Sequence, residues 1–71
     1  MSVKLPQPSF IVRHGVMRFL GEFHPAPLVV PRRGDRVIVQ TERGTEMGEV
    51  LCPATPQMVA AIPDATHGEL L

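Results

Sequence analysis

The residues of this chain that could bind a metal ion are few and lie far apart: His14, His24, His67 and Cys52. Structural zinc sites usually take their ligands in pairs about two to four residues apart, and none of these four residues has such a neighbour. The spacing indicates separate surface or turn histidines and a half-buried thiol at a strand end. We therefore expect this chain alone to bind no metal ion, iron–sulfur cluster or other cofactor.

The acidic residues have a simpler interpretation than acid–base catalysis. Four carboxylates lie close together in the sequence, at Asp35, Glu42, Glu46 and Glu49, and paired carboxylates can act as general acid and base. At alternating positions of strands, however, they form the solvated face of a hairpin. Nothing in the sequence identifies a base that would activate Cys52 as a nucleophile. We therefore expect no enzymatic activity.

Four arginines are the candidates for binding a partner or a nucleic acid: Arg32, Arg33, Arg36 and Arg43. The first three flank a Gly34–Asp35 turn and the fourth lies at a hairpin tip, so a barrel displays them together or at opposite ends, depending on its curvature. A shared patch would bind phosphate groups. The alternative is that the first three pair with local carboxylates such as Asp35 and Glu49. With three Phe and no Tyr or Trp, the stacking platform of a single-strand binder is weak or absent.

Length and composition restrict the elements that can position these residues. The chain has 71 residues, including eight prolines and six glycines, which would interrupt any long helix and so exclude a helical bundle. Its formal net charge is zero, so no global field attracts nucleic acid or an anionic membrane. The longest apolar run covers only Met58–Ile62. We therefore expect no membrane span, no secretory signal and a cytoplasmic location.

The first half of the chain predicts strands joined by glycine turns. Residues 9–20 are rich in β-branched and aromatic side chains and alternate at period two, which predicts a long strand. Gly15 either bends this strand through a bulge or splits it at a turn. Gly21 is expected to permit a turn before a short strand at Glu22–His24. Residues 24–34 form a proline-rich loop whose apolar centre is expected to fold back onto the core.

The second half contains the clearest hairpin, with strands at Arg36–Glu42 and Thr45–Cys52. Gly44 must take a positive φ, either as the second residue of a type I′ loop or as the last residue of a three-residue loop. The second version is favoured because arginine suits the first type I′ position poorly. Gly48 lets the second strand coil sharply, as small barrels require. In the Gly34–Asp35 turn, the Asp35 side chain is expected to accept backbone N–H bonds.

The C-terminal part predicts a helix and the start of a strand. Thr55–Ile62 has Thr55 as a suitable N-cap and Pro56 at the first helical position. After a loop at Asp64–Gly68, Glu69–Leu71 begins an apolar strand that the chain does not complete. We therefore expect an extended segment over residues 1–8 and one small β domain over residues 9–71, truncated at its C-terminal end. The unpaired sheet edge would invite a second copy, so we expect a homo-oligomer in this form.

Together these elements predict an all-β fold, a small SH3-like or otherwise closed barrel of about five strands with one short helix. A domain of this size buries a thin core. The core is expected to contain Phe10, Val12, Phe19, Phe23, Leu28, Val30, Val37, Val39 and Val50, with Met58 and Ile62 as further candidates.

Residues 34–50 resemble a family pattern. Their sequence, GDRVIVQTERGTEMGEV, is similar to G-D-x-V-x-V-x-T-x-R-G-x-E-x-G-x-V, which marks the PSP-one (polymerase-suppressor) C-terminal conserved domain family, including the bacterial RicT/YaaT-type proteins. Val12–Arg13 and Leu28–Pro31 also fit, so the similarity covers roughly residues 10–51 and the N-terminal part of that domain. The cysteines that RicT-type proteins use around iron–sulfur clusters have no counterpart here, and Cys52 matches none of them.

The resemblance implies a non-enzymatic scaffold module that assembles with protein partners in bacterial RNA processing or developmental regulation. The alternative is direct binding of RNA or DNA through Arg32, Arg33, Arg36 and Arg43. Salt distinguishes the two functions. Phosphate contacts make affinity fall steeply as salt rises, whereas a protein partner on an apolar groove is far less sensitive.

Overall fold

Five strands and one helix make up most of residues 8–71, the part of the chain that this computed structural model describes. The elements are β1 (Phe10–His14), β2 (Phe19–Pro25), β3 (Arg36–Thr41), β4 (Gly44–Pro53), α1 (Pro56–Ala61) and β5 (Thr66–Leu70). The strands close into a barrel, which confirms the predicted small all-β barrel with one short helix. The extended segment expected over residues 1–8 lies outside the described residues except for Pro8.

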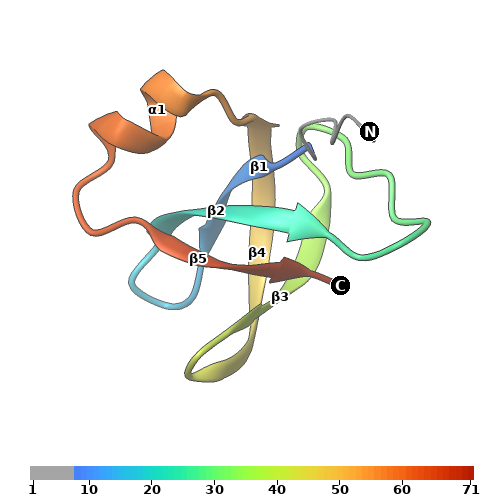
Figure 1. The fold of residues 1–71 in the computed structure, drawn as a ribbon. Coiled ribbons are helices and arrows are strands. Elements are labelled where there is room, and N and C mark those ends of the chain that lie inside the picture. The colour runs from blue at the N-terminus through green and yellow to red at the C-terminus, as the bar shows by residue number, and fades with distance from the viewer. Residues whose placement is uncertain (1–7) are drawn as a thin grey trace, which may run out of the picture.

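The barrel follows the strand order β1-β2-β5-β3-β4, with β4 returning to β1 (Figure 1). β2 and β5 pair in parallel, whereas the other neighbours pair antiparallel. β4 is long enough to serve two partners, because its first part pairs with β3 and its last part with β1. No helix within residues 8–71 is long and apolar enough to cross a membrane.

The first hairpin resolves the two alternatives left open at Gly15. Residues 15–18 form a turn that separates β1 from β2, so the long strand is split rather than bulged at this position. Gly15 has a φ of +76°, and its N–H donates to the carbonyl of Met47 at 3.0 Å. The prediction of a turn at Gly21 is wrong. Gly21 lies inside β2, where it pairs with Val12 of β1 on one side and with Thr66 of β5 on the other.

The second hairpin confirms the prediction for Gly44, which has a φ of +117°. Thr41 pairs with Gly44 across the tip formed by Glu42 and Arg43. Neither tip residue has a positive φ, and a type I′ turn requires positive φ at both central positions. This excludes the type I′ alternative. The register differs from the favoured three-residue loop too, because Gly44 is already paired with Thr41 and only Glu42 and Arg43 remain unpaired at the tip.

The C-terminal strand is longer and better paired than the sequence predicted. β5 begins at Thr66, so the loop predicted over Asp64–Gly68 is too long. Its residues pair with β2 on one side and with β3 on the other, where the Leu71 N–H also donates to the Ile38 carbonyl at 2.9 Å. The sheet edge that was expected to be open is therefore paired. Self-association through an open edge at this strand, which the sequence predicted, has no basis in the barrel.

The helix begins as predicted. Thr55 is the N-cap, its hydroxyl accepts the Met58 N–H at 3.2 Å, and Pro56 opens the first turn. The helix is shorter than expected, ending at Ala61, and none of its residues is buried. It therefore adds little to the core.

The core differs from the prediction at the loops and at the C-terminal end. Its buried cluster consists of Val12, Phe23, Val39, Val50 and Leu70, with Phe10, Val29 and Val37 packed against it. Leu28 and Val30 were expected inside but are largely exposed. Their loop makes a turn in which the Val29 N–H bonds to the Ala26 carbonyl, so Val29 alone faces the core. Phe19 and Met58 are nearly half exposed, which also corrects the prediction.

Glycines allow the strands to approach closely around Phe23. A Cβ atom at Gly68 would overlap the Gln40 carbonyl oxygen of β3, and one at Gly21 would lie 2.6 Å from the Thr66 carbonyl oxygen of β5. Gly48, expected to let β4 coil, has its Cβ position 2.7 Å from Val12 Cγ1. Because Gly68 lies beside the short β3–β5 pairing, it permits the barrel to close.

We expect Gly44→Val to lower the free energy of unfolding by about 1–3 kcal/mol, because a β-branched residue is strained at positive φ. No atom lies within 4 Å of the Cβ position, so the loss would come from backbone strain and not from a clash. Thr45→Val, one residue further along β4, is the control and should change stability by less than about 0.5 kcal/mol. Urea denaturation measures the free energy of unfolding of both variants. Equal losses of stability would contradict backbone strain at Gly44 as the cause.

We expect Gly68→Ala to lower the free energy of unfolding by about 2–3 kcal/mol, because the added methyl group forces β5 away from β3. Glu69→Ala, at an exposed neighbouring position, should change stability by about 0.5 kcal/mol or less. Thermal and urea unfolding of the two variants test this expectation. If the Gly68→Ala protein is as stable as the parent, the space between β5 and β3 has room for a side chain and the expectation is contradicted.

Candidate binding site at the barrel mouth

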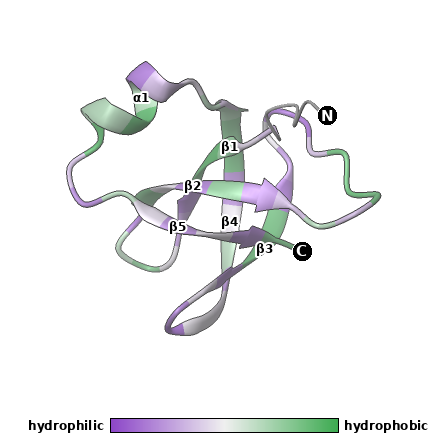
Figure 2. Cartoon of the chain, viewed as in Figure 1, coloured by the Kyte–Doolittle hydropathy of each residue, from purple (hydrophilic) through white to green (hydrophobic). Residues whose placement is uncertain are grey.

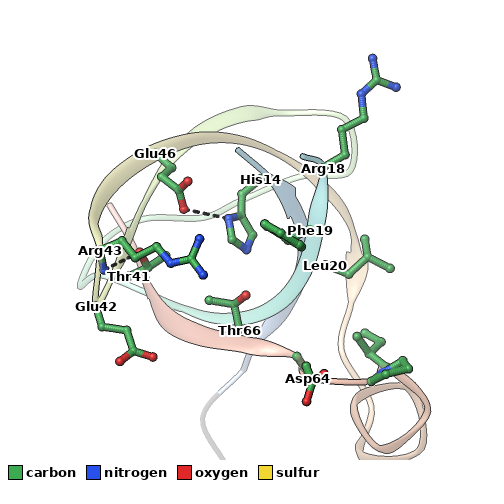
Figure 3. A pocket seen from close by; sticks show the side chains of 13 residues that line it. His14, Arg18, Phe19, Leu20, Thr41, Glu42, Arg43, Glu46, Asp64 and Thr66 are labelled. Atoms are coloured by element: carbon green, nitrogen blue, oxygen red, sulfur yellow. Dashed lines mark hydrogen bonds and ion pairs between the residues drawn. The ribbon is translucent and has the colours of Figure 1, made fainter. Parts of the chain in front are cut away.

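One end of the barrel carries a ring of five side chains, one from each strand: His14, Phe19, Thr41, Glu46 and Thr66. On each strand, the ring residue lies an even number of positions from a glycine or core residue that faces the barrel interior. Because side chains alternate along a strand, the ring residue faces inward too. The ring lines a cavity of about 540 Å³. Its rim consists of the β1–β2 turn, the β3–β4 tip and the segment between α1 and β5 (Figures 1 and 3). We call this cavity the barrel mouth.

His14 is held in the mouth by a carboxylate and two aromatic rings. Its Nδ1 atom lies 3.1 Å from Glu46 Oε1, and because a carboxylate can only accept, Nδ1 carries the proton and donates it. The imidazole meets the Phe23 ring edge to face at a centroid distance of 5.1 Å, and the Phe19 ring lies 6.3 Å away. The side chain is 2% exposed. These contacts fix the ring orientation and the tautomer of the neutral form.

The second ring nitrogen of His14 lacks a hydrogen-bond partner in the described part of the chain. Nε2 is shielded from solvent and makes no hydrogen bond within residues 8–71. Buried polar groups are nearly always paired, and an unpaired one costs about 1–3 kcal/mol. Since Nδ1 holds the proton of the neutral imidazole, Nε2 presents a buried acceptor. An acceptor of this kind in a cavity wall makes the mouth a candidate site for a hydrogen-bond donor.

Arg43 reaches into the same mouth from the β3–β4 tip (Figure 3). Its guanidinium carbon lies 5.9 Å from the centroid of the Phe19 ring, a cation–π distance. The tip itself is braced by Thr41, whose hydroxyl accepts the Arg43 N–H at 3.1 Å and donates to the Gly44 carbonyl at 3.3 Å. Among the ion pairs of residues 8–71, none involves Arg43.

The structure separates the four arginines that the sequence singled out. Arg32 and Arg33 lie in the exposed loop before β3, Arg36 begins β3, and Arg43 follows the other end of that strand. Of the two arrangements considered, the barrel adopts the one with arginines at opposite ends. The prediction of a single phosphate-binding patch formed by all four arginines is therefore wrong.

The Gly34–Asp35 turn has the structural role expected of it. Asp35 Oδ2 accepts the Arg32 N–H at 2.8 Å, which confirms the predicted side-chain cap. The turn is also bound to β4, since the Gly34 N–H donates to the Val50 carbonyl at 2.7 Å and the Asp35 carbonyl accepts the Val50 N–H at 2.9 Å. It therefore anchors the start of β3 without contributing to the mouth.

Arg36 gathers with different arginines from those expected. It lines a shallow hollow of about 450 Å³ together with Arg13, Arg18 and Glu49. Arg36, Glu49 and Arg13 occupy neighbouring positions on β3, β4 and β1. Glu49 forms its ion pair with Arg13, at 2.9 Å, and not with the arginines before β3. We call this surface the basic hollow.

The remaining candidate ligands stay apart. His67 Nδ1 lies 3.4 Å from Glu22 on the barrel exterior, and Cys52 Sγ lies 4.0 Å from Met58 Sδ. His24 is exposed on β2. Within residues 8–71, no three His, Cys, Asp or Glu residues are grouped as a metal ion would require.

Sequence reasoning missed the two residues at the centre of the mouth. Glu46 was expected on the solvated face of the hairpin, but it pairs with core residue Val39 and points inward. His14 was expected at the surface and is buried. The period-two pattern that includes Val12 and His14 was the available signal for the histidine. The same pattern was available for Glu46, because it lies four residues before Val50, an expected core residue of the same strand.

Comparisons of this chain with protein-family models, curated proteins and solved structures found no match.

Proposed function

We propose that this chain is a non-enzymatic binding module that docks a protein partner over the barrel mouth. The observation that carries this proposal is the group of exposed apolar side chains beside the mouth: Phe19 and Leu20, which line it, and Val16 and Met17 in the adjoining β1–β2 turn. They belong to the β1–β2 turn and the start of β2, a segment coloured as hydrophobic in Figure 2. Exposed apolar groups rimmed by polar residues are typical of protein interaction sites.

The mouth is better suited to recognition than to catalysis. His14 and Glu46 form a pair that resembles the base and orienting acid of a nucleophilic site. Such a site also needs a hydroxyl or thiol bound to the second imidazole nitrogen. In the described part of the chain, His14 Nε2 has no such partner, which favours a binding role.

The cellular context of the proposal rests on the resemblance of residues 34–50 to the PSP-one domain. We propose that the module assembles with cytoplasmic proteins in bacterial RNA processing or developmental regulation, as that resemblance implies. The residues of the resembling segment form the β3–β4 hairpin, which supplies Thr41, Arg43 and Glu46 to the mouth. The segment that carries the resemblance thus also supplies part of the site.

Affinity capture with variants of the rim tests this function. We expect Met17→Glu and Leu20→Glu each to reduce recovery of a partner from nuclease-treated bacterial lysate about tenfold or more, because a charge is introduced into a desolvated contact. Leu28→Glu is the matched control, since Leu28 is fully exposed on a loop that does not line the mouth. Quantitative mass spectrometry measures recovery. Equal losses with all three variants would contradict docking at the rim.

The basic hollow favours a second function, binding of RNA through its phosphate groups, which needs no aromatic stacking platform. Arg13, Arg18 and Arg36 face one carboxylate there, and only Arg13 is paired with it. Two guanidinium groups therefore remain for phosphate groups, so the hollow replaces the four-arginine patch as the candidate surface.

If RNA binds at the hollow, Arg18→Ala and Arg36→Ala should each reduce the slope of log affinity against log salt by about 0.7. Arg43→Ala, at the other end of β3, should leave that slope unchanged. Fluorescence anisotropy with labelled oligouridylate measures the slopes. Binding that is independent of salt, or equally affected by all three variants, would exclude this function.

A further inference from the structure

The buried acceptor in the mouth determines which kind of chemical group can complete it. His14 Nδ1 donates to Glu46, so Nε2 of the neutral ring offers a lone pair and no proton. Nε2 makes no hydrogen bond within residues 8–71. A group that satisfies it must donate an N–H or O–H. Ligands that carry only acceptors, such as a carboxylate, cannot do so.

The charges around the mouth favour a donor that is also positively charged. Glu42, Glu46 and Asp64 line the cavity. The opposing positive groups are Arg43, which points into the mouth, and Arg18, which points away from it in Figure 3. Glu42 and Asp64 likewise point away from the interior, so the charged groups inside the mouth are Glu46 and Arg43. When Arg43 swings outward, Glu46 remains, so a cationic donor would be attracted there and an anion would be repelled.

Arg43 already occupies part of this environment. Its guanidinium lies 5.9 Å from the centre of the Phe19 ring, which shows that the mouth accommodates a flat cation against an aromatic ring. Nε2 is shielded from solvent, so a ligand reaches it only when a side chain moves. Arg43 is exposed and belongs to a hairpin tip, and it can swing outward without disturbing the barrel.

We propose that the barrel mouth binds an arginine or lysine side chain of the partner protein, which displaces Arg43 and donates a hydrogen bond to His14 Nε2. This inference rests on the proposed docking of a protein over the mouth and specifies what that protein inserts. Phe19 provides the aromatic surface for the cation, and Glu46 provides negative charge while it orients the imidazole. Arg43 acts as an internal competitor for the site.

The test uses capped tripeptides as probes and the whole 71-residue chain. Acetyl-Gly-Arg-Gly-amide is titrated at pH about 8, where histidine side chains are ordinarily neutral, and NMR follows the His14 ring and the Phe19 ring. Acetyl-Gly-citrulline-Gly-amide has the same shape without the charge and serves as the ligand control. We expect the arginine peptide to shift both rings and to bind at least about fivefold more tightly than the citrulline peptide.

Two variants are expected to change the affinity for the arginine peptide in opposite directions. Arg43→Ala removes the competitor and should strengthen binding of the arginine peptide about two- to fivefold. Glu46→Gln removes the negative charge but keeps an acceptor for His14 Nδ1, and it should weaken binding. Glu49→Gln is the matched control, because Glu49 pairs with Arg13 outside the mouth, and it should have no effect. Amide spectra check that each variant is folded.

Several results would overturn the proposal. They are equal binding of the arginine and citrulline peptides, no response of the His14 ring to the arginine peptide, and weaker binding after Arg43→Ala. The last result, together with binding of acetyl-Gly-Glu-Gly-amide, would assign the mouth to an anion. Loss of partner recovery with Met17→Glu but not Leu28→Glu, combined with no peptide binding, would keep the docking function and remove only the basic side chain.

Discussion

The interior of this barrel is too narrow to hold a side chain at every inward position, and the rest of the structure follows from that limit. Phe23 is one of the fully buried core residues, and its ring fits because two of its neighbours lack side chains. The Cβ positions at Gly21 and Gly68 lie 2.8 and 3.0 Å from atoms of this ring. The large Phe23 ring thus occupies the space that the neighbouring glycines leave empty, an alternation of large and small residues that is common inside small barrels.

The same packing positions the candidate site. His14 stands edge to face on Phe23, so the central ring of the core forms the floor on which the imidazole rests. At the mouth, no inward position of the ring is a glycine, and the five side chains surround a cavity instead of a filled centre. Polar groups therefore line this open end of the interior. The mouth is a consequence of how the centre is filled.

The sequence predicted the features that local chemistry controls. The positive φ of Gly44, the Asp35 side-chain cap and the start of α1 at Thr55 each depend on a few adjacent residues. β5 was mostly missed, because a strand that carries Gly68 among polar residues resembles a loop until its partners are known. Leu70 was left out of the predicted core for the same reason. The pairing of His14 with Glu46 joins two strands that do not follow one another in sequence, and no local pattern fixes it.

The parallel pairing of β2 with β5 makes the mouth a late product of folding. The β1–β2 and β3–β4 hairpins join segments that are adjacent in the chain, whereas β2 and β5 are separated in sequence by β3, β4 and α1, so we expect their pairing to be the later step. Contacts between distant segments carry the larger loop-closure cost and form more slowly. Thr66 joins the ring only at this step. A molecule bound in the mouth would therefore slow the reopening of the barrel at β5, so occupancy and kinetic stability would rise together.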